Sequence, residues 1–197
     1  MRLVPTLLLI AIAAGAWNYV STRPISHAEG AIAPAAPVQV DRAGLPSFRV
    51  GSYHITPAAE FSLEARVLAT ETYRRGREAE LSPIDLALGW GPMSDNAVLD
   101  RLRISQGNRF YFYRWSDQPP IPPSDIVENS ANMHMIPATD EIKSRLDKVR
   151  VGQVVALSGY LVRVQSPDGW RWNSSMTRRD TGSGACEVVW VKAVTVR

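Results

Sequence analysis

The sequence feature that most constrains the fold is the strict alternation of apolar and polar residues in several segments. In residues 61–73, FSLEARVLATETY, every second residue from Phe61 to Ala69 is apolar, and most of the residues between them are polar or charged. A period of two places alternate side chains on opposite faces of a strand. The segment therefore predicts a strand with one face buried.

Other segments complete a predicted set of strands and helices. Further strands are expected at residues 82–90, 108–115, 152–164, 170–175 and 186–197. Two short helices are expected at residues 95–104 and 139–149, the second capped by Thr139, with Ile142 and Leu146 on its apolar face. Strands and helices that do not alternate regularly along the chain are typical of an α+β domain.

The order of these elements resembles the OB barrel, in which a helix lies between the third and fourth of five strands. The stretch VRVGQVVALSGYLVRV (149–164) is similar to an OB strand that bends at a glycine, here Gly159. The resemblance covers residues 60–197 and implies a barrel. We therefore expect an α+β fold, either a mostly antiparallel sheet of five or six strands or an OB-like barrel, with two short helices.

One N-terminal transmembrane helix is expected before this domain, at residues 3–20, LVPTLLLIAIAAGAWNYV. The run is apolar except for Thr6 and Asn18, and about 18 apolar residues can span a bilayer as a helix. A cleaved signal peptide is the alternative, with small residues Ser26 and Ala28 at a suitable spacing. Residues 1–20 are thus interpreted as a membrane anchor or a signal peptide.

The rest of the chain divides into an Ala/Pro-rich linker at residues 21–47 and a single exported domain at residues 48–197. Arg2 beside the free amino group favours a cytoplasmic N-terminus. In a bacterium this topology predicts a single-pass inner-membrane protein whose C-terminal domain faces the periplasm. The segments SPIDLALGWGPMSD, SANMHMIPA and DTGSGACE resemble an uncharacterised bacterial exported family, to which no activity attaches.

A cysteine and a histidine are the candidate catalytic residues. Cys186 is the single cysteine, and it follows four small residues at the start of a predicted strand. A nucleophilic cysteine needs a base, which His134 could supply, with Asp180 or Glu187 orienting the imidazole. The alternative is a buried, unreactive thiol and a loop histidine bound to the backbone.

Candidate ligand-binding residues lie in two places. In SANMHMIPA the polar residues Ser130, Asn132 and His134 recur at period two, so they share one face if this segment is extended. The second place is the aromatic and basic sequence that contains Trp170, Trp172, Arg178 and Arg179. Aromatic rings and arginines there could bind a glycan or a peptide. The alternative is core packing by the rings, with the arginines at its rim.

The function predicted from these patterns is a membrane-anchored binding or assembly module without catalytic activity. The alternative is a cell-envelope cysteine hydrolase or transpeptidase that uses Cys186 and His134. No cofactor and no metal site is predicted, because a single cysteine cannot build a Cys-rich zinc module. The expected partners are the membrane, through residues 3–20, and an envelope protein, glycan or peptide. An exported domain makes nucleic acid an unlikely ligand. The sequence carries no signal for an oligomeric state.

Overall fold

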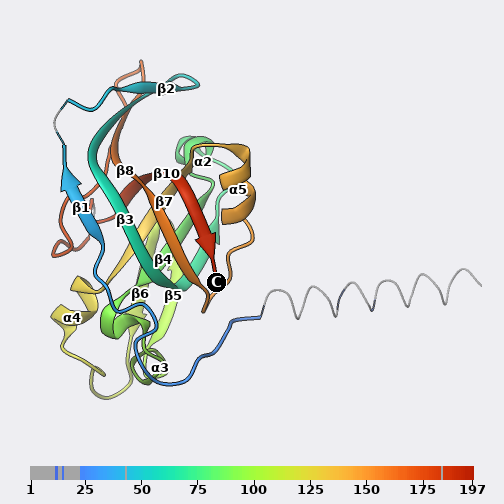
Figure 1. Cartoon of the computed structure of the whole chain (residues 1–197), viewed down its shortest axis with the longest axis vertical. Coiled ribbons are helices and arrows are strands. Elements are labelled where there is room, and N and C mark those ends of the chain that lie inside the picture. The colour runs from blue at the N-terminus through green and yellow to red at the C-terminus, as the bar shows by residue number, and fades with distance from the viewer. Residues whose placement is uncertain (1–11, 13–14, 16–22, 43, 183) are drawn as a thin grey trace, which may run out of the picture.

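The structure is a computed structural model that describes residues 12, 15, 23–42, 44–182 and 184–197. Within these residues the protein has a mostly-sheet α+β fold (Figure 1). Eight strands form one mixed sheet, two more form a separate hairpin, and four short α-helices lie around them.

The strands of the described residues are β1 (Val38–Asp41), β2 (Phe48–Val50), β3 (Tyr53–Thr72), β4 (Ile84–Gly89), β5 (Arg103–Gly107), β6 (Phe110–Arg114), β7 (Ser130–Pro137), β8 (Val154–Gln165), β9 (Arg171–Asn173) and β10 (Glu187–Val196). The helices are α2 (Arg77–Leu81), α3 (Asn96–Leu99), α4 (Pro123–Glu128) and α5 (Asp140–Leu146), with a 3-10 turn, η1, at Gly91–Ser94.

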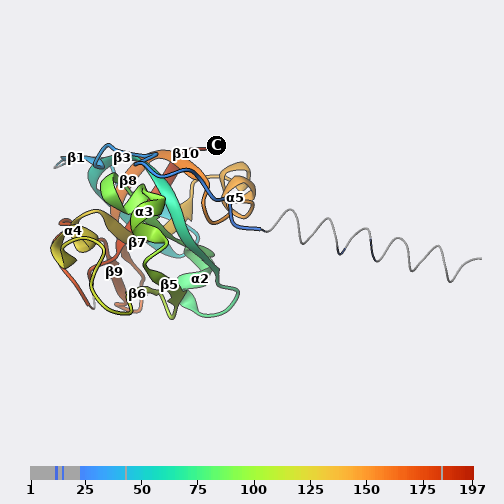
Figure 2. The same cartoon turned by 90° about the horizontal axis from the view of Figure 1, so that it is seen from below.

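Five strands of the large sheet form a partially closed ring in the order β3-β4-β7-β10-β8, because β3 pairs with β8 as well as with β4. The length of β3 permits this: its residues 54–66 pair with β8 and its residues 66–72 pair with β4. β7 and β10 are parallel, whereas the other pairs of this ring are antiparallel. Figure 2 shows β8 and β10 on one side of β7 and the β5–β6 hairpin on the other.

The interior of the ring is the main hydrophobic core. The alternation in β3 is confirmed, because Phe61, Leu63 and Ala65 are buried in this core. Helix α5 adds Ile142 and Leu146 to the same cluster. The predicted cap of this helix is also confirmed, since the Thr139 side chain accepts a hydrogen bond from the Ile142 amide. Each Phe, Leu or Ile side chain buried in this way contributes about 1.5–3 kcal/mol to folding.

Gly159 allows β8 and β10 to approach closely. A Cβ atom at this position would collide with the backbone carbonyl oxygen of Trp190, which no side-chain adjustment can relieve. The register of the pair shifts between Val191 and Ala193, directly after this contact. The predicted irregularity at Gly159 therefore arises from an extra residue in the partner strand, and the glycine makes room for it.

The predicted fold class is wrong in its details. The sheet of the described residues has eight strands instead of five or six, it is mixed because of the parallel β7–β10 pair, and it forms a partially closed ring. The described residues contain four short α-helices, since α2 and α4 occur in addition to α3 and α5 in the two predicted ranges. The helix expected at 95–104 is divided: η1 precedes it, α3 contains four residues, and β5 already begins at Arg103. Asp95 marks the start of α3, since its side chain caps the helix by accepting a hydrogen bond from the Ala97 amide.

The predicted transmembrane helix at residues 3–20 lies almost entirely outside the described residues. Among the described residues, no helix combines the length and the apolar character that a membrane span requires.

Part of the range predicted as a linker lies along the domain. The amide of Ile25 donates to the carbonyl of Val151 over 2.9 Å, and His27 Nε2 lies 2.7 Å from the carbonyl oxygen of Gly152. Ala33 is completely buried, and its amide donates to Ser94 Oγ. Strand β1 then pairs with β3, so residues 25–41 follow the surface of the sheet (Figure 1).

Candidate functional site

The polar residues of SANMHMIPA share one face of β7, the strand that follows α4. Ser130, Asn132 and His134 are 6%, 3% and 3% exposed. The residues between them face the opposite side, where Met133 and Met135 belong to the core of the ring. Three polar side chains therefore lie buried on the outer face of the ring, where each requires a hydrogen-bond partner.

The β5–β6 hairpin covers this face and supplies most of the partners. Gln106 Nε2 donates to Asn132 Oδ1 over 2.6 Å, and Asn132 Nδ2 donates to the carbonyl oxygen of Arg109 over 2.8 Å. The Tyr111 hydroxyl lies 2.5 Å from Ser130 Oγ. These contacts fix the hairpin to β7.

The turn of the hairpin determines where Arg109 lies. Asn108 and Arg109 both have positive φ angles, 51° and 69°. A two-residue turn of this kind matches the twist of the flanking strands. The left-handed conformation is unfavourable for an arginine, and contacts of Arg109 offset this cost. Its amide donates to the Tyr73 hydroxyl over 2.8 Å, and its guanidinium carbon lies 3.7 Å from the centre of the Tyr73 ring.

A buried carboxylate connects Arg109 to His134. Asp85 is the residue opposite His134 in the β4–β7 register, and its side chain is 0% exposed. Its Oδ2 lies 2.9 Å from His134 Nδ1, and its Oδ1 accepts from Arg109 Nη1 over 2.6 Å. The Trp172 ring packs over the imidazole with a centroid separation of 4.7 Å. His134 is thus enclosed and has a specific anionic partner.

Cys186 directly precedes β10 and contacts both Asn132 and a backbone carbonyl. Its Sγ donates to the carbonyl oxygen of Arg109 over 3.6 Å, and it lies 3.8 Å from Asn132 Nδ2. Burial raises the pKa of this thiol to about 11, outweighing the hydrogen bond from Asn132. The thiol is therefore protonated at neutral pH, whereas nucleophilic cysteines have a lowered pKa.

The three predicted catalytic residues have separate partners. His134 contacts Asp85, and Asp180 Oδ2 accepts from Ser175 Oγ over 2.7 Å. Within the described part of the chain, no hydrogen bond or ion pair joins Cys186 to His134 or to Asp180. The structure does bring together Cys186, which was predicted as a catalytic residue, and Asn132, which was predicted as a ligand-binding residue.

The four aromatic and basic candidates also have different surroundings. Trp170 is half-buried against Tyr53, at a centroid separation of 6.0 Å, and Trp172 covers His134. Arg178 points inward, whereas the Arg179 side chain is 81% exposed and pairs with Glu128. The two rings therefore serve mainly in packing, and Arg178 is the member of this set that reaches a cavity.

That cavity, here called the Cys186 pocket, has a volume of about 180 Å³. One wall consists of Phe110, Tyr111 and Tyr113 on β6. The opposite wall is the segment that leads into β10, which includes Asp180 and Cys186. The floor is the beginning of β7, from Ser130 to Asn132. The pocket is thus partly aromatic and partly polar, as small-molecule and side-chain sites commonly are.

An ion pair with unsatisfied hydrogen-bonding atoms also lines the Cys186 pocket. Arg178 Nη1 lies 3.0 Å from Glu187 Oε1, and the Glu187 side chain is 1% exposed. Among the described residues, neither oxygen of Glu187 has a donor with hydrogen-bond geometry, and Arg178 Nε and Nη1 have no acceptor with such geometry. Burial raises the pKa of Glu187 to about 8, although Arg178 acts in the opposite direction. Desolvation thus outweighs the ion pair.

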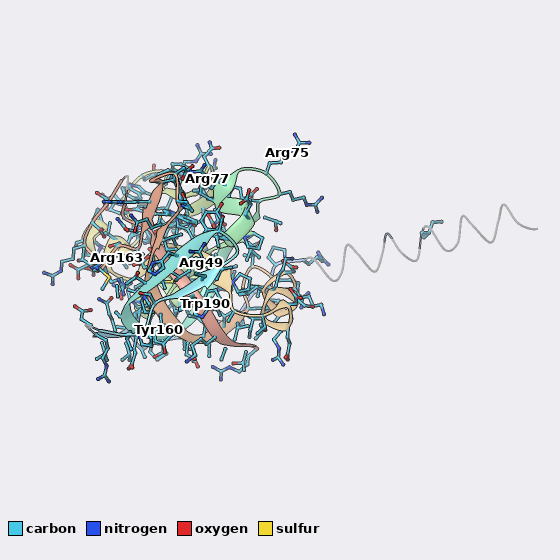
Figure 3. The ribbon with its side chains drawn as sticks, turned by 90° about the horizontal axis from the view of Figure 1, so that it is seen from above. Arg49, Arg75, Arg77, Tyr160, Arg163 and Trp190 are labelled. Carbon is cyan, nitrogen blue, oxygen red and sulfur yellow. The ribbon has the colours of Figure 1, made fainter. Side chains whose placement is uncertain are left out.

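A second surface combines basic and aromatic residues on the outside of the sheet. Figure 3 shows Arg49, Arg163, Tyr160 and Trp190 on this side of the molecule. The Trp190 ring packs on Phe48 at a centroid separation of 4.7 Å. Trp190 is therefore packed against a neighbouring ring, and Lys192 Nζ lies 4.9 Å from the centre of the Tyr160 ring. The buried polar atoms without partners, among the described residues, lie elsewhere.

Sequence reasoning did not identify Asp85 as a site residue or the unsatisfied state of Glu187. For Asp85 a signal existed, since it is the one charged residue in an otherwise apolar strand, IDLALG. No group of three or more metal-binding side chains occurs among the described residues. Comparison of the chain with protein-family models, with curated proteins and with solved structures finds no match.

Proposed function

We propose that this protein is a non-catalytic binding module, presented at a membrane, and that its ligand site is the Cys186 pocket. The observation that carries the proposal is Glu187. It is a carboxyl group buried beside a cavity, its nearest donor is Arg178 Nη1 at 3.0 Å, and neither of its oxygens has a partner with hydrogen-bond geometry among the described residues. Leaving a buried polar group unsatisfied costs about 1–3 kcal/mol, and such groups mark functional positions or missing partners.

The construction of the pocket supports a binding role. Its floor and its aromatic wall are held together by the Tyr111–Ser130 and Gln106–Asn132 hydrogen bonds. These contacts fix the side chains before a ligand arrives, which lowers the entropy cost of binding. The cavity of about 180 Å³ is smaller than the 300 Å³ or more of drug-sized ligand sites. It therefore suits one side chain of a peptide or protein partner, or a small molecule.

A cysteine hydrolase is the second candidate, favoured by one observation: Cys186 lines the pocket. Two others favour the binding role. The thiol has a pKa raised to about 11, and His134 is bound to Asp85. A nucleophilic cysteine would need a base within about 2.6–3.2 Å of its sulfur, or a strongly lowered pKa.

The membrane part of the proposal rests on the sequence of residues 3–20, whose apolar length matches a bilayer span. In a bacterial cell the domain would then face the periplasm on a single-pass anchor in the inner membrane. An envelope protein, glycan or peptide would be its partner.

The binding role is tested by NMR of the full chain in detergent micelles, titrated with a mixture of small organic probes: phenol, acetamide and isopropanol. The expected result is that the backbone amides that shift belong to the lining of the Cys186 pocket. The same titration on an Ala185→Trp variant, in which a large ring fills the pocket, should abolish these shifts. Shifts scattered over the surface, or identical shifts in the variant, would refute the binding role.

A further inference from the structure

We infer that the Cys186 pocket recognises an amide group, accepting its N–H at Glu187 and donating to its carbonyl oxygen from Arg178. This inference rests on the proposed binding function and specifies the chemical class of its ligand. It follows from the hydrogen-bonding atoms that the pocket leaves without partners.

The pocket contains unsatisfied acceptors. Both carboxyl oxygens of Glu187 are buried, and neither has a donor with hydrogen-bond geometry among the described residues, although Oε1 lies 3.0 Å from Arg178 Nη1. Because burial raises the pKa of this carboxyl group and keeps it largely protonated at neutral pH, it offers one O–H donor and one carbonyl acceptor, and a ligand that carries only acceptors would leave the carbonyl oxygen unsatisfied. A carboxylate or a phosphate is therefore disfavoured.

The pocket also contains unsatisfied donors. Arg178 Nη2 donates to Gln39 Oε1 over 2.6 Å, but Nε and Nη1 of the same guanidinium have no acceptor with hydrogen-bond geometry. Arginine has no acceptor of its own and remains charged. A ligand that carries only donors, such as an alkylammonium group, would leave these atoms unsatisfied and would bring a positive charge next to Arg178.

An amide satisfies both requirements at once, since it has N–H donors and a carbonyl acceptor in one planar group. It is also neutral, which suits the charges around Glu187. The ionisable groups that face this carboxyl group are Arg178, Asp180, Cys186 and Tyr111. With Arg178 and Asp180 of opposite sign, and with the Cys186 thiol protonated, the pocket has little net charge to attract an ion.

The rest of the pocket suits the groups on either side of an amide. Phe110, Tyr111 and Tyr113 offer aromatic surface to an apolar substituent. In the described residues β10 pairs with β7 from Met133 onward, so residues 130–132 of β7 pair on one side only, with β4. These residues form the floor of the pocket. An extended peptide can follow such an edge with its own backbone amides.

Three probes of similar shape separate the chemical classes: benzamide, benzoate and benzylammonium. Each is titrated into the full chain in detergent micelles, and dissociation constants are obtained from the shifts of pocket amides. We expect benzamide to bind roughly tenfold more tightly than either ion, because each ion leaves a buried hydrogen-bonding group unsatisfied. N-methylbenzamide shows which kind of amide the pocket recognises. Tighter binding than benzamide indicates a backbone amide, and weaker binding indicates an Asn or Gln side chain.

The Glu187→Met/Arg178→Met double variant replaces the buried ion pair by apolar side chains of similar length, a change that buried pairs often tolerate. It should lose the tenfold preference for benzamide. The matched control is Glu60→Met/Arg42→Met, which removes an exposed ion pair, 3.4 Å apart, and should keep the preference. The comparison of the three probes on the wild-type chain tests the inference even if the double variant fails to fold.

The outcomes distinguish this inference from the proposed function. Equal affinity for all three probes in the pocket would overturn the amide inference and leave the binding role standing, and so would tightest binding of either ion. If neither these three probes nor the mixture of phenol, acetamide and isopropanol shifts the amides of the pocket, both the amide inference and the binding role are overturned.

Discussion

His134 Nδ1 lies 2.9 Å from Asp85 Oδ2, and both side chains are buried between β4, β7 and the β5–β6 hairpin. The histidine that could have served Cys186 as a base thereby lies against the buried carboxylate that binds the hairpin through Arg109. In this ionic network, Arg109 Nη1 lies 2.6 Å from Asp85 Oδ1. Since Arg109 lies two residues before Tyr111 in this hairpin, the network also positions the aromatic wall of the Cys186 pocket.

The variant Asp85→Asn should therefore be strongly destabilised. It removes the anionic partner of Arg109 and His134, and breaking a buried ion pair typically costs about 3–5 kcal/mol. Urea denaturation followed by circular dichroism measures this loss. Glu60→Gln, at an exposed pair, is the control and should change stability by less than about 0.5 kcal/mol. If Asp85→Asn loses as little stability as the control, the contacts of Asp85 with Arg109 and His134 contribute little to folding.

The variant Glu187→Gln should alter how stability depends on pH. Burial raises the pKa of Glu187 from 4.5 to about 8 in the folded chain, so between these pH values the folded state binds more protons at this site than the unfolded state. Stability from this group is therefore greatest at low pH and decreases as pH rises from about 4.5 to about 8.

Denaturation at a series of pH values checks this effect of Glu187. The variant should lack this part of the decrease and should be more stable than the wild type by a few kcal/mol above pH 8, because each pKa unit corresponds to about 1.4 kcal/mol. Parallel pH profiles for wild type and variant would contradict the raised pKa.

Alkylation of Cys186 by iodoacetamide should be slow in the folded protein. A thiol with a pKa of about 11 contains far less thiolate at neutral pH than a free cysteine with a pKa of about 8.5, so we expect labelling at least roughly a hundredfold slower. Mass spectrometry of samples taken over time measures the rate, and the same chain unfolded in guanidinium gives the reference. Labelling of the folded chain faster than the reference would favour the cysteine hydrolase.

The variant Gly159→Ala should be destabilised, because its Cβ would collide with the Trp190 carbonyl oxygen at the irregular part of the β8–β10 pair. Overpacking of this kind typically costs about 1–3 kcal/mol. Gly107→Ala is the matched control, since it also lies in a strand but has no atom within 4 Å of the added Cβ. The midpoints of thermal unfolding should differ by several degrees between the two variants. Equal midpoints would show that the β10 backbone at Trp190 can move to accommodate the added Cβ without a measurable loss of stability.

Membrane anchoring through residues 3–20 predicts that the full chain stays in the membrane pellet after extraction with alkaline carbonate. The variant Leu9→Lys/Ile10→Lys places two charges in the middle of the apolar run and should move the protein to the soluble fraction. Mass spectrometry of the purified chain then separates anchor from signal peptide. A product that lacks the N-terminal segment would show cleavage.

The sequence predicted the strands that alternate most regularly, and the residues that share a face of β7. Ser130, Asn132 and His134 recur at period two, and this spacing alone fixes their common direction in a strand. What covers that face could not be predicted, because the contacts of Gln106 and Arg109 with Asn132 depend on how the hairpin folds back over the sheet.

The strands that were missed have weak local signals. β1 lies in an Ala/Pro-rich range and is mostly exposed, with no alternation to indicate it. β3 begins at Tyr53, well before the predicted start, and it contains Pro57, at which the register with β8 shifts. A proline normally argues against the interior of a strand. Pairing with β8 outweighs that local preference.

The burial of Glu187 was equally hidden, since glutamate is rarely buried and only the geometry of the segment before β10 encloses it. The unsatisfied atoms of Glu187 and Arg178 depend on the arrangement of several segments, and no spacing in the sequence encodes them.

The most direct test of the binding role is an NMR titration of the wild-type chain and the Cys186→Ala variant with benzamide. The predicted result is that the shifted amides lie at Tyr111, Asn132 and Glu187 in both proteins, with dissociation constants within about threefold of each other, because the thiol donates to the Arg109 carbonyl and not to the ligand. Shifts that instead lie around Arg163 and Trp190 on the face in Figure 3, or binding that disappears with the thiol, would contradict it.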